Sequence, residues 1–90
     1  MRFEVKVPEE LWPRRGGWSG VVVRLLKREG DAVSPGEVVA EVEIEKAVLE
    51  IESPVGGVVE EVVSGEGSRV GPGSVILVVR RGKAEAEGED

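Results

Sequence analysis

The chain contains no cysteine, histidine or tyrosine among its 90 residues. Without cysteine it can form no disulfide and offers no thiolate nucleophile. A zinc site would also lack its usual imidazole and thiolate ligands, so we expect no metal centre. General acid–base catalysis is left with carboxylates and four lysines. The composition therefore argues against an independent enzyme.

Long apolar runs are absent as well. No stretch reaches the length needed to span a membrane, and no secretory signal is visible. We therefore expect a cytoplasmic protein without a membrane partner.

Asn, Gln and Thr are also missing, while Glu, Val and Arg are abundant. A composition rich in charge and poor in amides is typical of hyperthermophile proteins, which predicts a thermophile source.

The charge is unevenly distributed along the chain. The formal net charge is −6, and residues 37–66 contain nine glutamates but only one basic residue, Lys46. An acidic field repels phosphate backbones, so a nucleic-acid partner is disfavoured. The glutamates could steer a basic partner surface toward the protein, or they could simply form a solvated face. The sequence leaves both interpretations open.

The two halves of the chain repeat each other. Residues 20–42 align without a gap on residues 57–79 when the sequence is shifted by 37 positions. Two copies are too few for a solenoid, so the repeat predicts two similar halves around a quasi-two-fold axis. Repeated glycines are expected in turns that need positive φ or a close approach of two chain segments. These turn glycines are Gly30, Gly36, Gly57 and Gly67.

Abundant valine and scarce aromatic residues favour strands. Short apolar or alternating segments are separated by Gly and Pro turns, which is typical of a sandwich or barrel. The predicted strands are 3–7, 21–26, 32–33, 37–44, 47–52, 58–63, 69–70 and 75–80. We expect one all-β domain over residues 1–81. Residues 82–90 carry nothing to bury and are expected to form a disordered tail or the start of a linker.

The central segment predicts a hairpin with a lysine at its tip. If Glu45 and Lys46 form the turn, Ile44 pairs with Ala47, apolar residues share one face and glutamates share the other. A slip of one residue would bury the glutamates, so the pattern fixes this register. Glu-Lys is not a favoured pair for a two-residue turn. The tip therefore serves a purpose other than turn formation, and a displayed lysine suits attachment of a cofactor.

Segments 30–47, 52–59 and 65–67 resemble a lipoyl domain of the biotinyl/lipoyl attachment family. Such domains occur in the dihydrolipoamide acyltransferase component of 2-oxo acid dehydrogenase complexes. The resemblance covers residues 3–79 and rests on a Gly-Asp turn, a Glu-x-x-Lys-Ala tip and a Ser-Pro-x-x-Gly turn in the right order. It implies a flattened eight-stranded barrel or sandwich of two quasi-two-fold-related halves. It also implies lipoate joined by an amide bond to Lys46.

The resemblance implies a carrier function. In the family, lipoate is acylated at a thiamine-diphosphate-dependent 2-oxo acid dehydrogenase, delivers the acyl group at an acyltransferase core, and is reoxidised by a dihydrolipoyl dehydrogenase. A lipoate–protein ligase attaches the cofactor. The cofactor performs the chemistry while the protein presents it, so the domain itself is expected to be non-catalytic. The isolated domain is expected to be a monomer.

The tip departs from the common family pattern Glu-Thr/Ser-Asp-Lys-Ala, because Ile44 and Glu45 replace the hydroxyl residue and the aspartate. Glu43, Glu45 and Ala47 are predicted to be read by the ligase and partner enzymes, although solvation alone also explains the glutamates. In loop 8–17, Trp12 and Arg14 are predicted to contribute to partner choice. The alternative is that Trp12 covers the core, since tryptophan is usually largely buried.

Three other functions remain as alternatives. A biotinyl carrier has the same fold, but that family places Met on both sides of its lysine, where this chain has Glu45 and Ala47. An unmodified barrel could act as a structural or adaptor module. An enzyme with paired carboxylates is the third, but nothing in the chain predicts a pocket around such a pair.

Overall fold

Short valine-rich segments form eight strands in the computed structural model, which describes residues 1–9 and 19–81. The strands are β1 (Arg2–Lys6), β2 (Gly20–Leu25), β3 (Ala32–Val33), β4 (Val38–Ile44), β5 (Ala47–Glu52), β6 (Gly57–Val62), β7 (Arg69–Val70) and β8 (Val75–Arg80). The bounds predicted from the sequence differ from these by at most one residue. The predicted tail, 82–90, lies outside the described residues. No helix in the described part of the chain is long and apolar enough to cross a membrane.

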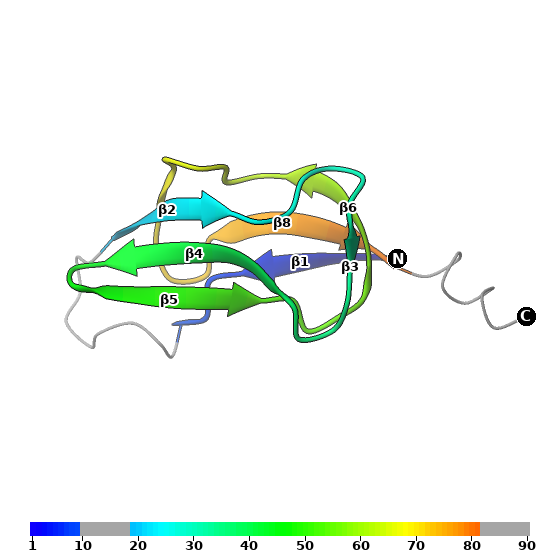
Figure 1. The fold of residues 1–90 in the computed structure, drawn as a ribbon, viewed down its shortest axis with the longest axis horizontal. Coiled ribbons are helices and arrows are strands. Elements are labelled where there is room, and N and C mark those ends of the chain that lie inside the picture. Colours follow the sequence, from blue (N-terminus) through cyan, green and yellow to red (C-terminus); the bar gives the residue numbers. More distant parts are fainter. Residues whose placement is uncertain (10–18, 82–90) are drawn as a thin grey trace, which may run out of the picture.

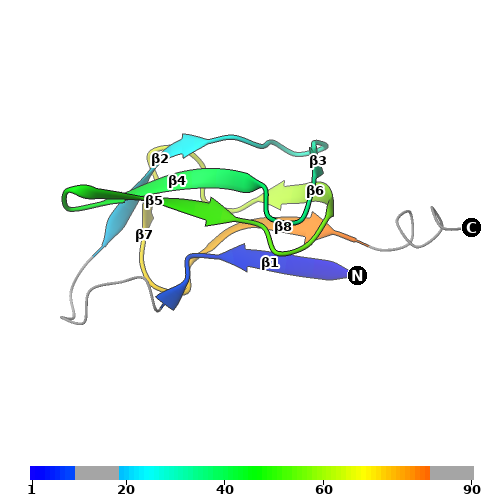
Figure 2. The same ribbon diagram turned by 60° about the horizontal axis from the view of Figure 1, so that its bottom comes forward.

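The strands form two four-stranded antiparallel sheets, with orders β1-β8-β6-β3 and β5-β4-β2-β7. Figures 1 and 2 show the two sheets as two layers of a sandwich. The predicted all-β sandwich is therefore confirmed. Under the sequence repeat, β2 corresponds to β6, β3 to β7 and β4 to β8. β1 occupies beside β8 the place that β5 occupies beside β4, although the repeat does not relate their sequences. One sheet thus reproduces the strand order of the other.

The quasi-two-fold relation extends to single hydrogen bonds. Equivalent amides donate to equivalent carbonyls in the two halves: Gly30 N to Val59 O (2.8 Å) matches Gly67 N to Val22 O (2.8 Å), and Leu26 N to Val39 O (2.9 Å) matches Val63 N to Ile76 O (2.9 Å). The bulges repeat too, between Val22 and Arg24 in β2 and between Val59 and Glu61 in β6. The repeat in the sequence is therefore a repeat in backbone geometry.

The core lies between the sheets and consists of aliphatic side chains from both halves. Its fully buried members include Val5, Val22, Val39, Val42, Ile51, Val59, Ile76, Leu77 and Val79. Burying a side chain of this type stabilises the fold by about 1.5–3 kcal/mol. Ser53 is the one buried polar residue of the described ranges, and its hydroxyl donates to the carbonyl oxygen of Val55 at 2.7 Å. Apart from Ser53, the core is thus aliphatic.

The repeated glycines have two different roles. Gly30, Gly36 and Gly67 adopt φ values of 92°, 85° and 90° in turns, a region that side-chain-bearing residues rarely occupy. Gly57, the first residue of strand β6, has φ of 156° and also lies at a close approach of two chain segments, so it meets both expectations for these glycines. A Cβ atom at this position would overlap the carbonyl oxygen of Arg80. Gly57 is therefore needed because β6 and β8 approach closely.

The ends of the described fold meet. Arg2 is paired with Arg80, and the amide of Arg81 donates to the carbonyl oxygen of Met1 at 2.7 Å. Figures 1 and 2 both show the N-terminal end of β1 at the opposite end of the molecule from the β4–β5 turn. Under the repeat, the positions equivalent to this turn are residues 82–83, which lie outside the described residues.

Candidate functional site

The β4–β5 hairpin has the register that the sequence predicts. Ile44 pairs with Ala47, Glu43 with Val48 and Val42 with Leu49. Glu45 and Lys46 are therefore the two central residues of the turn, and both are exposed. Alternation fixes this arrangement, because a shift by one residue would exchange the buried and exposed faces.

The two faces of the hairpin differ sharply in burial. The side chains of Val42, Ile44 and Ile51 are 0%, 5% and 1% exposed, whereas Glu43 and Glu50 lie on the open face. The inner face anchors the hairpin in the core, so the turn is held by packing on both strands. Lys46 thus projects from a rigid support.

The turn itself adopts an unusual backbone conformation. Glu45 has φ of 56° and is the one non-glycine residue with positive φ in the described ranges. Positive φ at the first central residue alone is the pattern of a type II′ hairpin turn, which normally has glycine there. A non-glycine residue in this region costs about 1–3 kcal/mol. The sequence shows that Glu-Lys is a poor turn pair but does not reveal which residue carries the strain.

Gly20 holds the neighbouring strand against the hairpin. A Cβ atom at this position would lie 2.9 Å from the carbonyl oxygen of Glu43 and 2.9 Å from Cγ1 of Val42. Only glycine lets β2 lie this close to β4 near the turn. We did not predict this supporting role from the sequence, although Gly20 is the repeat partner of Gly57 and the same signal could have identified both.

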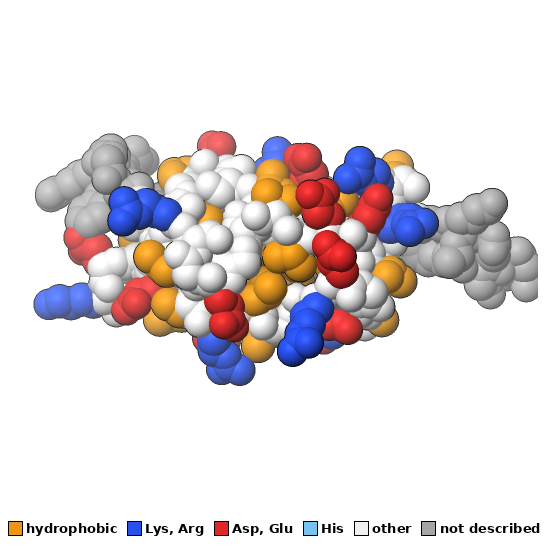
Figure 3. All heavy atoms as spheres, turned by 90° about the horizontal axis from the view of Figure 1, so that it is seen from above, with side chains coloured by type: hydrophobic (Ala, Val, Ile, Leu, Met, Phe, Trp, Pro, Cys, Tyr) orange, Lys and Arg blue, Asp and Glu red, His pale blue; other side chains and the backbone are white. Residues whose placement is uncertain are grey.

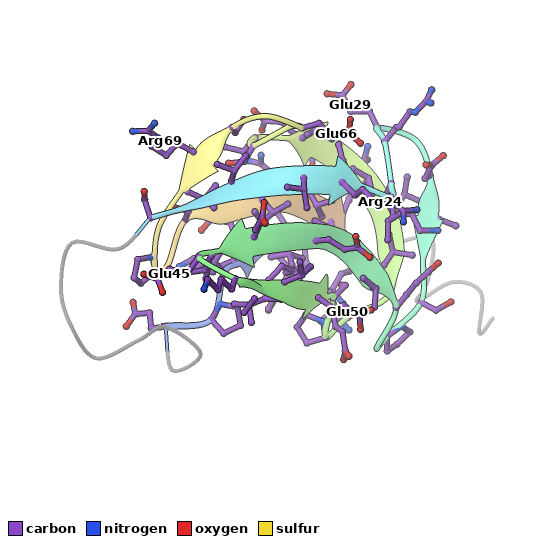
Figure 4. The ribbon with its side chains drawn as sticks, turned by 60° about the vertical axis from the view of Figure 1, so that its left-hand side comes forward. Arg24, Glu29, Glu45, Glu50, Glu66 and Arg69 are labelled. Atoms are coloured by element: carbon purple, nitrogen blue, oxygen red, sulfur yellow. The ribbon has the colours of Figure 1, made fainter. Side chains whose placement is uncertain are left out.

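Several carboxylates lie on the open face of the hairpin and its neighbours (Figure 4). Glu41 and Glu50 are directly opposite each other across the strands, and like charges in that position are destabilising. Arg24 of β2 approaches Glu41, with an Nη1–Oε1 distance of 3.9 Å. Within the described ranges, Glu43 and Glu50 form no ion pair.

An ion pair secures the turn that precedes β4. The Nζ atom of Lys27 lies 2.8 Å from Oε2 of Glu37 and also donates to the carbonyl oxygen of Ala32 at 2.9 Å. The amide of Ser34 donates to Oε1 of Glu37 at 2.9 Å. The hydrogen bond from Lys27 and then that from Ser34 lower the pKa of Glu37 below its usual value. This pair holds the turn that leads into β4 and is not part of the β4–β5 turn.

Among the residues singled out from the sequence, Glu43, Glu45, Lys46 and Ala47 come together at the hairpin turn. Trp12 and Arg14 lie outside the described residues. The described ranges contain no group of three or more acidic, His or Cys side chains placed to hold a metal ion. Two shallow hollows lined by described residues lie along β1, around Phe3 and Lys6, and neither is lined by Lys46. Within the described ranges, Lys46 lies at an exposed turn and not in either of these hollows.

The Biotin_lipoyl family, described as "Biotin-requiring enzyme", matches residues 14–79. The chain belongs to this family. The match spans both halves of the repeat and the hairpin between them, and it leaves out strand β1. The family resemblance predicted from the hairpin and turn motifs is confirmed.

Sequence relatives of the chain are acetyltransferase components of much greater length. The chain is 59% identical over 34 residues to the dihydrolipoyllysine-residue acetyltransferase component of the pyruvate dehydrogenase complex of Rickettsia typhi, a match that covers 38% of this chain. It is 42% identical over 53 residues to the same component of Zymomonas mobilis, which covers 59% of this chain. The chain spans 8% and 11% of the length of these two relatives.

Solved structures show the same fold. The lipoyl domain of the 2-oxoglutarate dehydrogenase complex from Azotobacter vinelandii is 26% identical, with a TM-score of 0.67, and the match covers 88% of this chain and 99% of that one. The urea carboxylase of Kluyveromyces lactis contains a similar fold, with a TM-score of 0.71 at 18% identity, covering 89% of this chain and 6% of that one. The family fold therefore occurs both as a separate lipoyl domain and within large carboxylases.

Proposed function

We propose that the chain is a lipoyl carrier domain in which lipoate is joined by an amide bond to Nζ of Lys46. One observation carries the proposal: Lys46 is displayed at the turn of a hairpin whose register and inner face are fixed by the core. The similarity to lipoyl domains and to acetyltransferase components supports lipoate as the attached group.

The residues present at the tip fit an attached group. Lys46 is exposed, and within the described ranges its amine forms no ion pair. Nothing in these ranges has to be displaced before Nζ forms an amide. The strands on either side of the turn hold the backbone of Lys46 in place, so only its side chain has to move. A lipoyl group on this lysine would supply a dithiolane that can carry an acyl group and two reducing equivalents.

In this proposal the domain is a non-catalytic carrier. Its function is to present the arm in turn to a thiamine-diphosphate-dependent 2-oxo acid dehydrogenase, an acyltransferase core and a dihydrolipoyl dehydrogenase. Tethering the arm near these enzymes raises its effective concentration at each active site. The attachment turn and the joined ends of the fold lie at opposite ends of the molecule, so a chain tethered through its ends leaves Lys46 facing outward.

A biotinyl carrier is the second candidate, because the family includes biotin-requiring enzymes. The residues on either side of Lys46 distinguish a biotinyl carrier from a lipoyl carrier. Biotin attachment in this family places methionine on both sides of the lysine, whereas Glu45 and Ala47 flank Lys46 and Met1 is the single methionine of the chain. The residues at the tip therefore favour lipoate.

Intact mass spectrometry tests the assignment. The protein is incubated with lipoate, ATP and a lipoate–protein ligase, and in parallel with biotin, ATP and a biotin ligase, using wild type and Lys46→Ala. We expect wild type to gain one lipoyl unit and Lys46→Ala to gain none, with unchanged circular dichroism. Equal modification of wild type and Lys46→Ala would show that the group is attached at a residue other than Lys46. A gain in mass with biotin alone would favour a biotinyl carrier. No gain in mass with either ligase would overturn the carrier function.

A further inference from the structure

The open face of the β5-β4-β2-β7 sheet exposes three valines near the hairpin turn, and Figure 4 shows this face. Val48 of β5 pairs with Glu43 of β4, which also pairs with Val21 of β2. Val23 follows at the bulge in β2. The side chains of Val48, Val21 and Val23 are 54%, 38% and 39% exposed. We call these three residues the valine strip.

The other half of the molecule has an ion pair in the place of two of these valines. Val23 is the extra residue of the bulge in β2, and Glu60 is the equivalent extra residue in β6. Val48 has on β5 the register position that Arg2 has on β1. Nε of Arg2 lies 3.1 Å from Oε1 of Glu60. The half that carries the hairpin turn therefore has two apolar side chains where the other half has a charged pair.

Core packing does not explain the valine strip. Within the described ranges, none of its three residues belongs to the core or to the hydrophobic side chains packed against it. Soluble proteins usually protect an edge strand with charged side chains, as β1 does with Arg2, Glu4 and Lys6. The edge strand β5 departs from this at Val48, directly after the turn. The position of these apolar side chains indicates a group that covers them from outside the core.

We propose that the valine strip is a resting site for the group attached to Lys46, and that it holds the methylene chain of a lipoyl arm. This inference rests on the proposed function. When Nζ becomes part of an amide it loses its positive charge, so the lysine side chain and the lipoyl chain together form an uncharged and mostly apolar arm. Contact between this arm and the three valines removes apolar surface from water on both sides, which is favourable.

The arm is anchored within reach of the valine strip. Lys46 precedes Val48 by two positions, which is the spacing of residues on one face of a strand. Val21 lies two strands away from Val48, so the row between them spans about 10 Å. An extended chain of about ten bonds spans roughly 12 Å, and a lipoylated lysine is at least this long. The whole strip is therefore accessible to a chain that starts at Lys46.

The size of the valine strip favours a tethered chain over a protein partner. A stable protein interface buries about 1,200–2,000 Å², which three valines beside Glu41 and Glu43 do not offer. Figure 3 shows hydrophobic side chains in small groups between charged ones on one face of the molecule, without one large apolar area. A tethered chain needs less contact, because its tether provides an effective concentration on the order of millimolar. The contact is also weak enough to release the arm.

Nuclear magnetic resonance of the lipoylated protein tests the resting site. The protein is modified to completion with lipoate, ATP and a lipoate–protein ligase, and intact mass verifies one lipoyl unit per chain. We expect nuclear Overhauser contacts between the methylene protons of the arm and the methyl groups of Val21, Val23 and Val48. Val58, which is 42% exposed on the other sheet, should show none. The methyl resonances of the valine strip should also shift on lipoylation, whereas those of Val58 should not.

The double variant Val23→Glu, Val48→Arg is the matched test, because it places the ion-pairing side chains of the other half on this face without changing the net charge. Circular dichroism and melting check its fold. We expect its arm to lose the contacts with Val21, since two of the three apolar neighbours are gone. Val58→Ser is the control on the opposite sheet and should keep the contacts of wild type. Each variant is compared after complete modification, so a change in the rate of attachment does not affect the result.

The outcomes separate this resting site from the carrier function. A wild type that gains no lipoyl mass overturns both. A fully lipoylated wild type without contacts between the arm and the valine strip overturns the resting site alone, whatever the variants do. Contacts with Val21 that persist in the folded double variant would also contradict it. A second copy of the chain is the competing occupant: valine-strip resonances that shift with the concentration of unmodified wild type would assign the strip to a dimer and overturn the resting site.

Discussion

At the scale of single residues, the backbone of Glu45 differs from the rest of the described ranges because the turn stores strain directly beside Lys46. Glu45→Gly removes the side chain that positive φ disfavours, at the cost of more freedom in the unfolded chain. We expect a net gain of about 1 kcal/mol, which corresponds to a rise in melting temperature of about 4–8 °C for a domain of this size. Thermal unfolding followed by circular dichroism measures it.

Lys46→Gly is the control for this prediction. Lys46 is not among the residues with positive φ, so glycine there relieves nothing and should lower stability by about 0.5–1 kcal/mol. If the two variants shift the melting temperature in the same direction, the strain at Glu45 does not contribute as described.

The Lys27–Glu37 pair makes stability depend on pH. The pKa of Glu37 is lower in the folded protein than its ordinary value, so the pair stabilises the fold above pH 4.5 and this contribution is lost as the pH falls through the lowered pKa. Glu37→Gln should therefore be less stable than wild type near neutral pH and should converge with it in acid. Chemical denaturation at several pH values between 7 and 3 measures the difference.

Glu52→Gln is the matched control, because Glu52 is an exposed carboxylate without an ion pair within the described ranges. Its unfolding should follow the pH dependence of wild type. A Glu37→Gln curve that runs parallel to wild type over the whole range would show that the ion pair contributes nothing to folding.

At the scale of elements, the contact between β2 and the hairpin depends on Gly20. Gly20→Ala would place a methyl group 2.9 Å from the carbonyl oxygen of Glu43, so β2 or β4 must shift. Crowding of this kind typically costs about 1–3 kcal/mol. Urea denaturation should show this loss, and lipoyl attachment should slow as the turn moves. Gly65→Ala, which meets no atom within 4 Å, should change neither property measurably.

The sequence predicted the elements well because each strand has a clear physical signature. Alternation along Glu43–Ile51 fixed the hairpin register, and the repeat fixed the correspondence of the two halves. The bulges in β2 and β6 were not predicted, since an extra residue in a strand has no composition signal of its own. The repeat indicated a special position at Gly57, but the atom that it approaches, the carbonyl oxygen of Arg80 in β8, depends on tertiary packing that local sequence does not encode.

The sequence also predicted which residues lie at the β4–β5 turn. Lys46, Glu43 and Glu45 were identified because alternation places them at and beside the turn. The strain at Glu45 and the contact of β2 with the hairpin at Gly20 were not, because φ values and the pairing of β2 with β4 depend on the assembled sheet. Trp12 and Arg14 stay predictions, as they lie outside the described residues.

At the scale of the whole molecule, composition predicts high thermal stability. The chain lacks Asn, Gln and Thr, and 33% of its residues are charged. If this reflects a thermophile source, the domain should melt above about 65 °C, the upper end of the range typical of mesophile domains. Differential scanning calorimetry measures it, and a midpoint between about 45 and 65 °C would contradict the thermophile prediction.

The hydrogen bond between Arg81 and Met1 has a consequence for engineering. Since the two ends of the fold meet at one point, the whole sandwich can be spliced into a surface loop of a host protein as a cassette, with entry and exit side by side. The seven residues of β4 extend about 23 Å, so the lysine would stand clear of the host surface by roughly that length. The inserted fold would hold Lys46, one of the four lysines of the chain, at the end that points away from the host.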